Sequence, residues 1–171
     1  MFNLKIADMI RQFTENDLYA INEIINDSAT AYRGIIPTDM YNEPYMTMQE
    51  LKTQLEDGIQ FWCYEKHSQI LGVMGIQSKE GVTLIRHAYV RSGHRNMGIG
   101  GKLLMYLCQG SHLPILIGTW ADASWAINFY QNHGFRLILG AEKDLMLQKH
   151  WNISARQVET SVVLTNYNSK D

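Results

Sequence analysis

The stretch that decides the fold is Val90 to Leu104, with the sequence VRSGHRNMGIGGKLL. It follows Val82–Val90, an apolar segment rich in β-branched residues, which predicts a strand. From Gly98 onward apolar residues recur at helical spacing, so we expect a helix that ends at Gly110. A strand that turns directly into a helix places unpaired backbone N–H groups and the positive end of the helix dipole at the turn.

The composition of this turn favours an anionic ligand. Gly98, Gly100 and Gly101 remove side chains that would keep a ligand away from the backbone, and glycine tolerates positive φ. Arg95 adds positive charge, and Lys102 lies just beyond the glycines. These features predict a pyrophosphate site. The alternative is that the glycines only let the strand and the helix pack closely.

Two known nucleotide motifs do not match this turn. The Walker motif fails because no Gly-Lys-Ser/Thr follows at the required spacing. The dinucleotide pattern G-x-G-x-x-G fails because Leu103 stands where its third glycine belongs. A nucleotide-binding protein that uses the same turn therefore remains only a weaker alternative.

A third pattern does match. Residues Arg95-Asn96-Met97-Gly98-Ile99-Gly100 resemble the Gln/Arg-x-x-Gly-x-Gly/Ala signature with which the GNAT superfamily of N-acetyltransferases binds the pyrophosphate of acetyl-CoA. A second family element is similar in register, Ala126–Tyr130 followed by Gly134-Phe135. The resemblance spans about Leu71 to Leu139. One departure is Ala123, where many members carry an Asn that contacts the pantetheine arm.

The element order predicts the fold class. A run of strands before an alternating part indicates a mixed sheet with helices packed on it. Together with the resemblance, this gives an α/β protein of the α+β type, with a mostly antiparallel central sheet, splayed parallel strands and helices on both faces. We expect helices from Thr14 and Thr47 and over 98–110 and 124–134, and strands over 61–65, 70–77, 82–90, 114–120, 135–139 and 158–164. A single domain is expected over 1–171, with its core at about 9–165 and a polar tail at 166–171.

Composition bounds the function. The 171 residues are 46% hydrophobic with a net charge of −2, which excludes disorder and makes nucleic acid an unexpected partner. No apolar run suits a membrane span, and the segment 1–8 is broken by Lys5 and Asp8, unlike a signal peptide. Two cysteines, Cys63 and Cys108, form neither a disulfide framework nor a four-ligand metal site. We expect a cytoplasmic protein without a metal, a monomer or homodimer, and no membrane partner.

The resemblance implies where acetyl-CoA binds as the co-substrate. GNAT enzymes hold it between two splayed parallel strands, which here would be Val82–Val90 and Pro114–Trp120. Backbone groups of Ala88, Tyr89 and Val90 would bind the pantetheine arm like an added strand. The pyrophosphate would be held by the N–H groups of Arg95, Asn96, Met97, Gly98, Ile99, Gly100 and Gly101.

The resemblance also suggests two catalytic residues. Tyr130 matches a tyrosine that lies beside the CoA sulfur in many members, and a phenol can protonate a departing thiolate. Alternatively, Tyr130 only packs beside Phe129. His87 is the candidate base, because a strand would place it on the face of Ile85 and Tyr89 and because histidine titrates near neutrality. A purely structural histidine is nearly as good an interpretation.

Substrate selection is expected from the tyrosine-rich irregular stretch after residue 31 and from the end of the second splayed strand. Candidates to line an acceptor pocket are Tyr32, Arg33, Tyr45 and Trp120. Ordinary loop packing is the alternative. The sequence thus predicts an acetyl-CoA-dependent N-acetyltransferase that acts on a primary amine of a small molecule or peptide. The competing hypothesis is a non-catalytic acyl-CoA-binding sensor or regulatory module.

Overall fold

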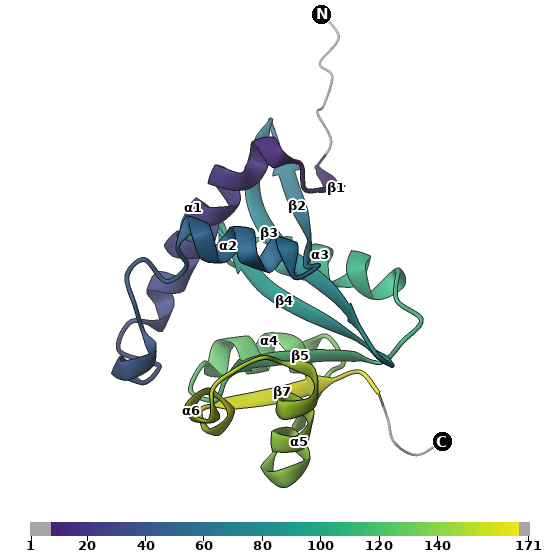
Figure 1. Cartoon of the computed structure of the whole chain (residues 1–171). Coiled ribbons are helices and arrows are strands. Elements are labelled where there is room, and N and C mark those ends of the chain that lie inside the picture. The colour runs from purple at the N-terminus through teal and green to yellow at the C-terminus, as the bar shows by residue number, and fades with distance from the viewer. Residues whose placement is uncertain (1–7, 168–171) are drawn as a thin grey trace, which may run out of the picture.

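The computed structural model describes residues 8–167, which form one seven-stranded sheet with helices on both faces (Figure 1). The predicted tail, 166–171, and the amino-terminal segment, 1–8, lie mostly outside the described residues. The strands are β1 (Met9–Gln12), β2 (Gln60–Lys66), β3 (Gln69–Lys79), β4 (Val82–Val90), β5 (Ile115–Trp120), β6 (Arg136–Ile138) and β7 (Ser161–Thr165). The α-helices are α1 (Leu18–Ala29), α2 (Met48–Glu56), α3 (Ile99–Gln109), α4 (Ser124–Asn132), α5 (Gly140–His150) and α6 (Ala155–Glu159).

The sheet has the order β1-β2-β3-β4-β5-β7-β6, and β4 with β5 is its parallel pair. The other neighbours run antiparallel, which confirms the predicted fold class. The parallel ladder ends with the pair Ile85 and Ile117. Beyond this pair the two strands diverge towards their carboxyl ends (Figure 1). The sheet is therefore split in its centre.

A β-bulge lies on β4 where the strands begin to diverge. The register with β3 shifts between Val73 and Gly75, and His87 has a φ of 53°. An extra residue interrupts the alternation of a strand. The side chains of Arg86 and His87 consequently both reach Gln54 of α2. The expectation that His87 shares a face with Ile85 is wrong, because Ile85 packs on the opposite face in the cluster with α3.

Helices cover the two faces of the sheet with separate apolar cores. On one face α3 and α4 pack on Met74, Ile85 and Ile117. On the other face α1 and α2 cover β2 and β3, while α5 and α6 cover β5 and β7. The predicted start of α2 is confirmed, because the Thr47 hydroxyl accepts the Glu50 N–H at 3.1 Å and the Glu50 carboxylate accepts the Thr47 N–H at 2.7 Å. This capping box satisfies donors that a helix start leaves free.

The structure adds two helices that the sequence pattern did not predict. In α5 the apolar residues 145–147 are consecutive rather than spaced at helical period, and Leu145 is 67% exposed. Val158 belongs to α6, not to the last strand, which begins only at Ser161. Short helices of this kind are fixed by tertiary contacts, which override a weak local pattern.

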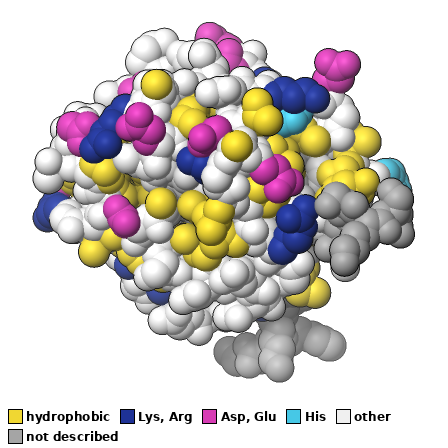
Figure 2. All heavy atoms as spheres, turned by 90° about the horizontal axis from the view of Figure 1, so that it is seen from below, with side chains coloured by type: hydrophobic (Ala, Val, Ile, Leu, Met, Phe, Trp, Pro, Cys, Tyr) yellow, Lys and Arg dark blue, Asp and Glu magenta, His cyan; other side chains and the backbone are white. Residues whose placement is uncertain are grey.

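The surface is of mixed polarity. The face seen from below carries acidic and basic side chains interspersed with apolar ones (Figure 2). Over residues 8–167, no helix combines the length and the apolar character that crossing a bilayer requires.

The close approach of β3 to the bulge requires a glycine, which leads to a stability prediction. A Cβ at Gly75 would lie 2.8 Å from the backbone oxygen of Arg86 and 2.8 Å from Ile59 Cγ2. Because a backbone atom cannot move aside cheaply, Gly75→Ala should lower the free energy of unfolding by about 1–3 kcal/mol in urea denaturation. Gly93→Ala is the matched control, since a Cβ there meets nothing within 4 Å. Equal stability of the two variants would contradict the packing.

Candidate active site

The unpaired edge of β4 is the first part of the site. From residue 86 to residue 90, β4 remains paired with β3, for example through Gly72 and Val90. On its β5 side the ladder has already ended at Ile85. Backbone N–H and C=O groups without a strand partner can bind an extended ligand as an added strand. Ala88, Tyr89 and Val90, the candidates for the pantetheine arm, lie on this edge.

The amino-terminus of α3 is the second part. Gly98 is its N-cap, with a φ of 78°, open space around its Cα and no side-chain cap. The helical bonding begins with the Lys102 N–H and the Gly98 oxygen, at 3.0 Å. The first N–H groups of a helix have no partner within it, so those from Ile99 to Gly101 suit an anion.

The other candidate residues of this turn have additional, structural roles. A Cβ at Gly100 would lie 3.3 Å from the Phe129 ring, and one at Gly101 would lie 2.8 Å from His133 Nε2. These two glycines therefore let α3 approach α4, whereas the alternative interpretation expected them to let the strand and the helix pack closely. Arg95 donates to the Ser28 oxygen at 2.9 Å, which fixes the turn, with Asn96 and Met97, beside the end of α1.

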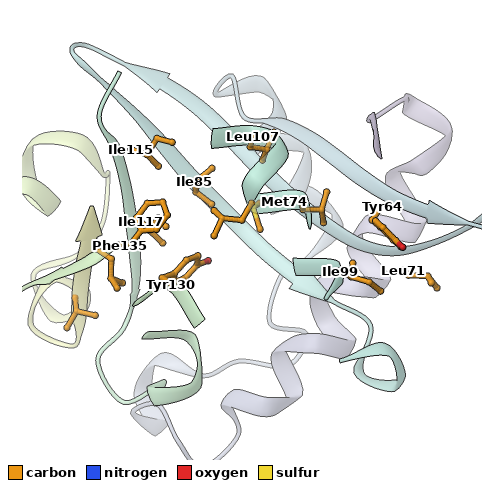
Figure 3. Packing of buried hydrophobic residues seen from close by; sticks show 14 residues of the cluster. Tyr64, Leu71, Met74, Ile85, Ile99, Leu107, Ile115, Ile117, Tyr130 and Phe135 are labelled. Carbon is orange, nitrogen blue, oxygen red and sulfur yellow. The ribbon is translucent and has the colours of Figure 1, made fainter. Parts of the chain in front are cut away.

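Tyr130 projects from α4 into the centre of the split sheet. Its ring packs edge-on against Phe129 and Phe135, and its hydroxyl points away from Phe135 (Figure 3). Burial raises its pKa, so the phenol keeps its proton at neutral pH. Tyr130 is 6% exposed, and no hydrogen bond within residues 8–167 involves its hydroxyl. The hydroxyl is therefore free to donate.

His87 lies across the bulge from Tyr130, on the α2 face. Its Nε2 is 2.9 Å from Gln54 Oε1, and its ring stacks on Phe61. An amide oxygen only accepts, so Nε2 carries the hydrogen and Nδ1 is left as the acceptor. Burial, with a smaller effect of Arg86, lowers the pKa of His87 to about 3. The ring is neutral at pH 7 and is a weak proton acceptor.

Aromatic side chains from distant segments gather at the end of β5. The Trp120 Nε1 donates to the Tyr45 hydroxyl at 2.9 Å, and the Tyr32 and Tyr45 rings lie 5.4 Å apart. The phenols of Tyr89 and Tyr130 lie near enough to Tyr32 to interact with it electrostatically. The structure thus brings three of the four predicted acceptor residues together.

Arg33, the fourth, is not part of this cluster. Its guanidinium pairs with Glu43, and its side chain is 63% exposed. Instead the structure adds the side chains of Tyr89, Arg86 and Gln54, which sequence reasoning missed as side-chain contributors. Tyr89 and Arg86 are separated from each other by the bulge. Gln54 is one of several polar residues on α2, so no periodic signal distinguished it.

Comparisons with known proteins agree with this geometry. A model of the acetyltransferase (GNAT) domain matches residues 57–137. The peptidyl-lysine N-acetyltransferase YiaC of Escherichia coli K12 is 26% identical over 152 residues, covering 89% of this chain and 99% of the relative. A GNAT-family acetyltransferase of Staphylococcus aureus Mu50 superimposes with a TM-score of 0.68 at 21% identity, covering 94% and 100% of the two chains.

A further solved structure contains coenzyme A. The PaiA N-acetyltransferase of Thermoplasma acidophilum, in complex with coenzyme A, gives a TM-score of 0.71 at 15% identity and covers 95% of this chain and 100% of its own. Sequence and fold agree on the class of protein, an N-acetyltransferase. The domain match over residues 57–137 and the similarity to YiaC over 89% of the chain support the GNAT superfamily as its family.

The low pKa of His87 predicts a pH-dependent stability. In the unfolded chain a histidine titrates near 6.5. Below that pH the unfolded state therefore binds a proton at His87, whereas the folded state does not bind it until the pH approaches 3. The contribution of the neutral His87 to the free energy of unfolding is complete above pH 6.5 and is lost as the pH falls towards 3. Between pH 7 and pH 5 the wild type should lose about 1–2 kcal/mol more unfolding free energy than His87→Gln.

Urea denaturation at both pH values measures this difference. His112→Gln, at an exposed position, is the matched control for the loss of an imidazole. A His87→Gln variant with the same pH dependence as the wild type would show that the His87 ring is not desolvated.

Proposed function

We propose that this chain transfers the acetyl group of acetyl-CoA directly to a primary amine of a peptide or small molecule. The observation that carries the proposal is the protonated Tyr130 hydroxyl, which has no hydrogen-bond partner among residues 8–167 and whose ring packs with Ile85 and Ile117, where β4 leaves β5. A buried hydroxyl that only packed would be expected to have a hydrogen-bond partner.

The co-substrate fits the unpaired groups of the split sheet. The β4 edge at residues 88–90 would bind the pantetheine arm, and the N–H groups at the start of α3 would bind the pyrophosphate. Ala123, fully buried at the N-cap of α4, offers no side-chain amide to the arm, so backbone bonding carries more of the binding.

The chain would perform two tasks during the reaction. Bound acetyl-CoA supplies a thioester carbon that a neutral amine can attack. Free N–H groups of the β4 edge would stabilise the negative charge that develops on the carbonyl oxygen. Tyr130 would give its proton to the sulfur as the thiolate leaves. The amine proton would pass to water, because a base with a pKa of about 3 holds it poorly at neutral pH.

The aromatic cluster supports an amine as the acceptor. The rings of Tyr32, Tyr45 and Trp120 form an apolar wall, within which Trp120 Nε1 donates to the Tyr45 hydroxyl. Partial desolvation by such a wall favours the neutral form of an alkyl amine, which is the nucleophile the reaction needs. The similarity to a peptidyl-lysine N-acetyltransferase makes the ε-amino group of lysine the first acceptor to test.

Replacing Tyr130 with Phe removes the proton donor and keeps the ring. We expect kcat to fall by about 100-fold or more with a lysine peptide, because positioned general acids contribute roughly 10²–10⁴ in rate. The Kd for acetyl-CoA should change less than about twofold by calorimetry, since the binding groups are backbone groups. Tyr19→Phe, at a position of α1 whose side chain is 78% exposed, is the matched control. Unchanged turnover would remove Tyr130 from the chemistry.

Ligand specificity can be tested without knowing the acceptor. Acetyl-CoA at 100 times its Kd should stabilise the native state by about 2.7 kcal/mol, whereas ATP and NAD should not. Thermal unfolding with each ligand measures this. Stabilisation by acetyl-CoA without turnover of any amine would point to a non-catalytic acyl-CoA-binding module instead.

A further inference from the structure

Arg86 lies beside the proposed reaction centre. Its charged side chain has no role in the mechanism proposed above. It is the first residue of β4 beyond the ladder with β5. Its side chain lies on the face covered by α2, where Nη1 donates to Gln77 Oε1 at 2.9 Å and Nη2 donates to Gln54 Oε1 at 3.2 Å. The same Gln54 oxygen binds His87, so Arg86 and His87 share one anchor.

The guanidinium has no carboxylate partner among residues 8–167. Other arginines of the chain do form such ion pairs, namely Arg11, Arg33, Arg91 and Arg156. Asp57 affects Arg86 only at longer range, and burial lowers the pKa of the guanidinium. A partly buried charge is normally paired, because desolvation without a counter-ion is costly.

Arg86 also has donors to spare. A guanidinium carries five N–H donors in a rigid fork that matches a carboxylate. Partners among the described residues account for one donor on each terminal nitrogen, and Nε has none. Nε is not a fully buried atom, so it remains in contact with solvent. A ligand that reaches Arg86 can therefore accept hydrogen bonds from its guanidinium.

We infer that Arg86 binds a carboxylate of the acceptor, so that the preferred substrate is an amine that carries a carboxylate nearby. In a peptide this is an Asp or Glu next to the acetylated lysine, and in a small molecule it is an amino acid. Gln54 and Gln77 hold the guanidinium in place as neutral partners and leave its charge for the ligand. The inference rests on the proposed function for the identity of the acceptor.

The test compares matched acceptors that differ only in the carboxylate. One arm uses capped lysine peptides with Glu or Gln on either side of the lysine, and the other uses 4-aminobutyrate against butylamine. KM is measured from the release of CoA thiol, and Kd is measured by calorimetry in the presence of CoA, where no turnover occurs. The wild type should favour the carboxylate member of one arm by about tenfold or more, as charged hydrogen bonds do, and that arm identifies the source.

Variants separate a role in recognition from a role in the fold. Arg86→Gln should abolish the preference and leave the Kd for acetyl-CoA unchanged, while Arg86→Lys should keep part of it. Arg136→Gln, which removes the same charge from β6 at the far edge of the sheet, should keep it in full. A preference that Arg86→Gln abolishes supports the inference.

Three results would overturn it. The first is a wild type that binds the members of both pairs equally or binds none of them. The second is an Arg86→Gln variant that retains the preference. The third is a variant that weakens both members alike, which would make Arg86 structural. Absence of turnover with every amine would refute the proposed function, whereas the Kd comparison would still decide the role of Arg86.

Discussion

The parallel ladder between β4 and β5 is the interaction on which the rest of the structure depends. It consists of the pairs that run from Thr83 with Ile115 to Ile85 with Ile117, and its apolar side chains are buried on both faces. These pairs lie at the amino-terminal ends of β4 and β5. They therefore join the two halves of the sheet there and let the halves separate at the carboxyl ends of the two strands. A longer ladder would close the edge of β4 that the proposed co-substrate needs.

The bulge on β4 turns this split into a two-sided site. Ordinary alternation sends Ile85 towards α3 and Tyr130 and Arg86 towards α2, and the inserted residue sends His87 to the α2 face as well. Strand backbone thus separates two chemically different surroundings. One is apolar with a single protonated phenol, and the other contains a neutral imidazole, a cation and amides. Under the proposed function, the thioester and the amine would meet between them.

Much of the fold could be predicted because local sequence patterns determine it. The order of strands, the start of α2 at Thr47 and the glycine turn before α3 all have local signals, and the family resemblance placed the splayed pair. The failures were α5, α6 and the face of His87. In α5 the apolar residues are not periodic, and a bulge leaves no mark in the spacing of side chains. Both are decided by contacts with distant strands.

By itself the sequence determined the class of fold and the glycine turn before α3, because hydrophobic periodicity and glycines act over a few neighbouring residues, and the family resemblance singled out Tyr130. Only the tertiary structure decided which side chains meet. It joined Tyr32 and Tyr45 to Trp120, moved Arg33 away to Glu43, and gave Gln54 to Arg86 and His87 together. Such pairings depend on where separate segments pack. Burial, with a smaller effect of Arg86, keeps His87 neutral, and no carboxylate among residues 8–167 pairs with Arg86.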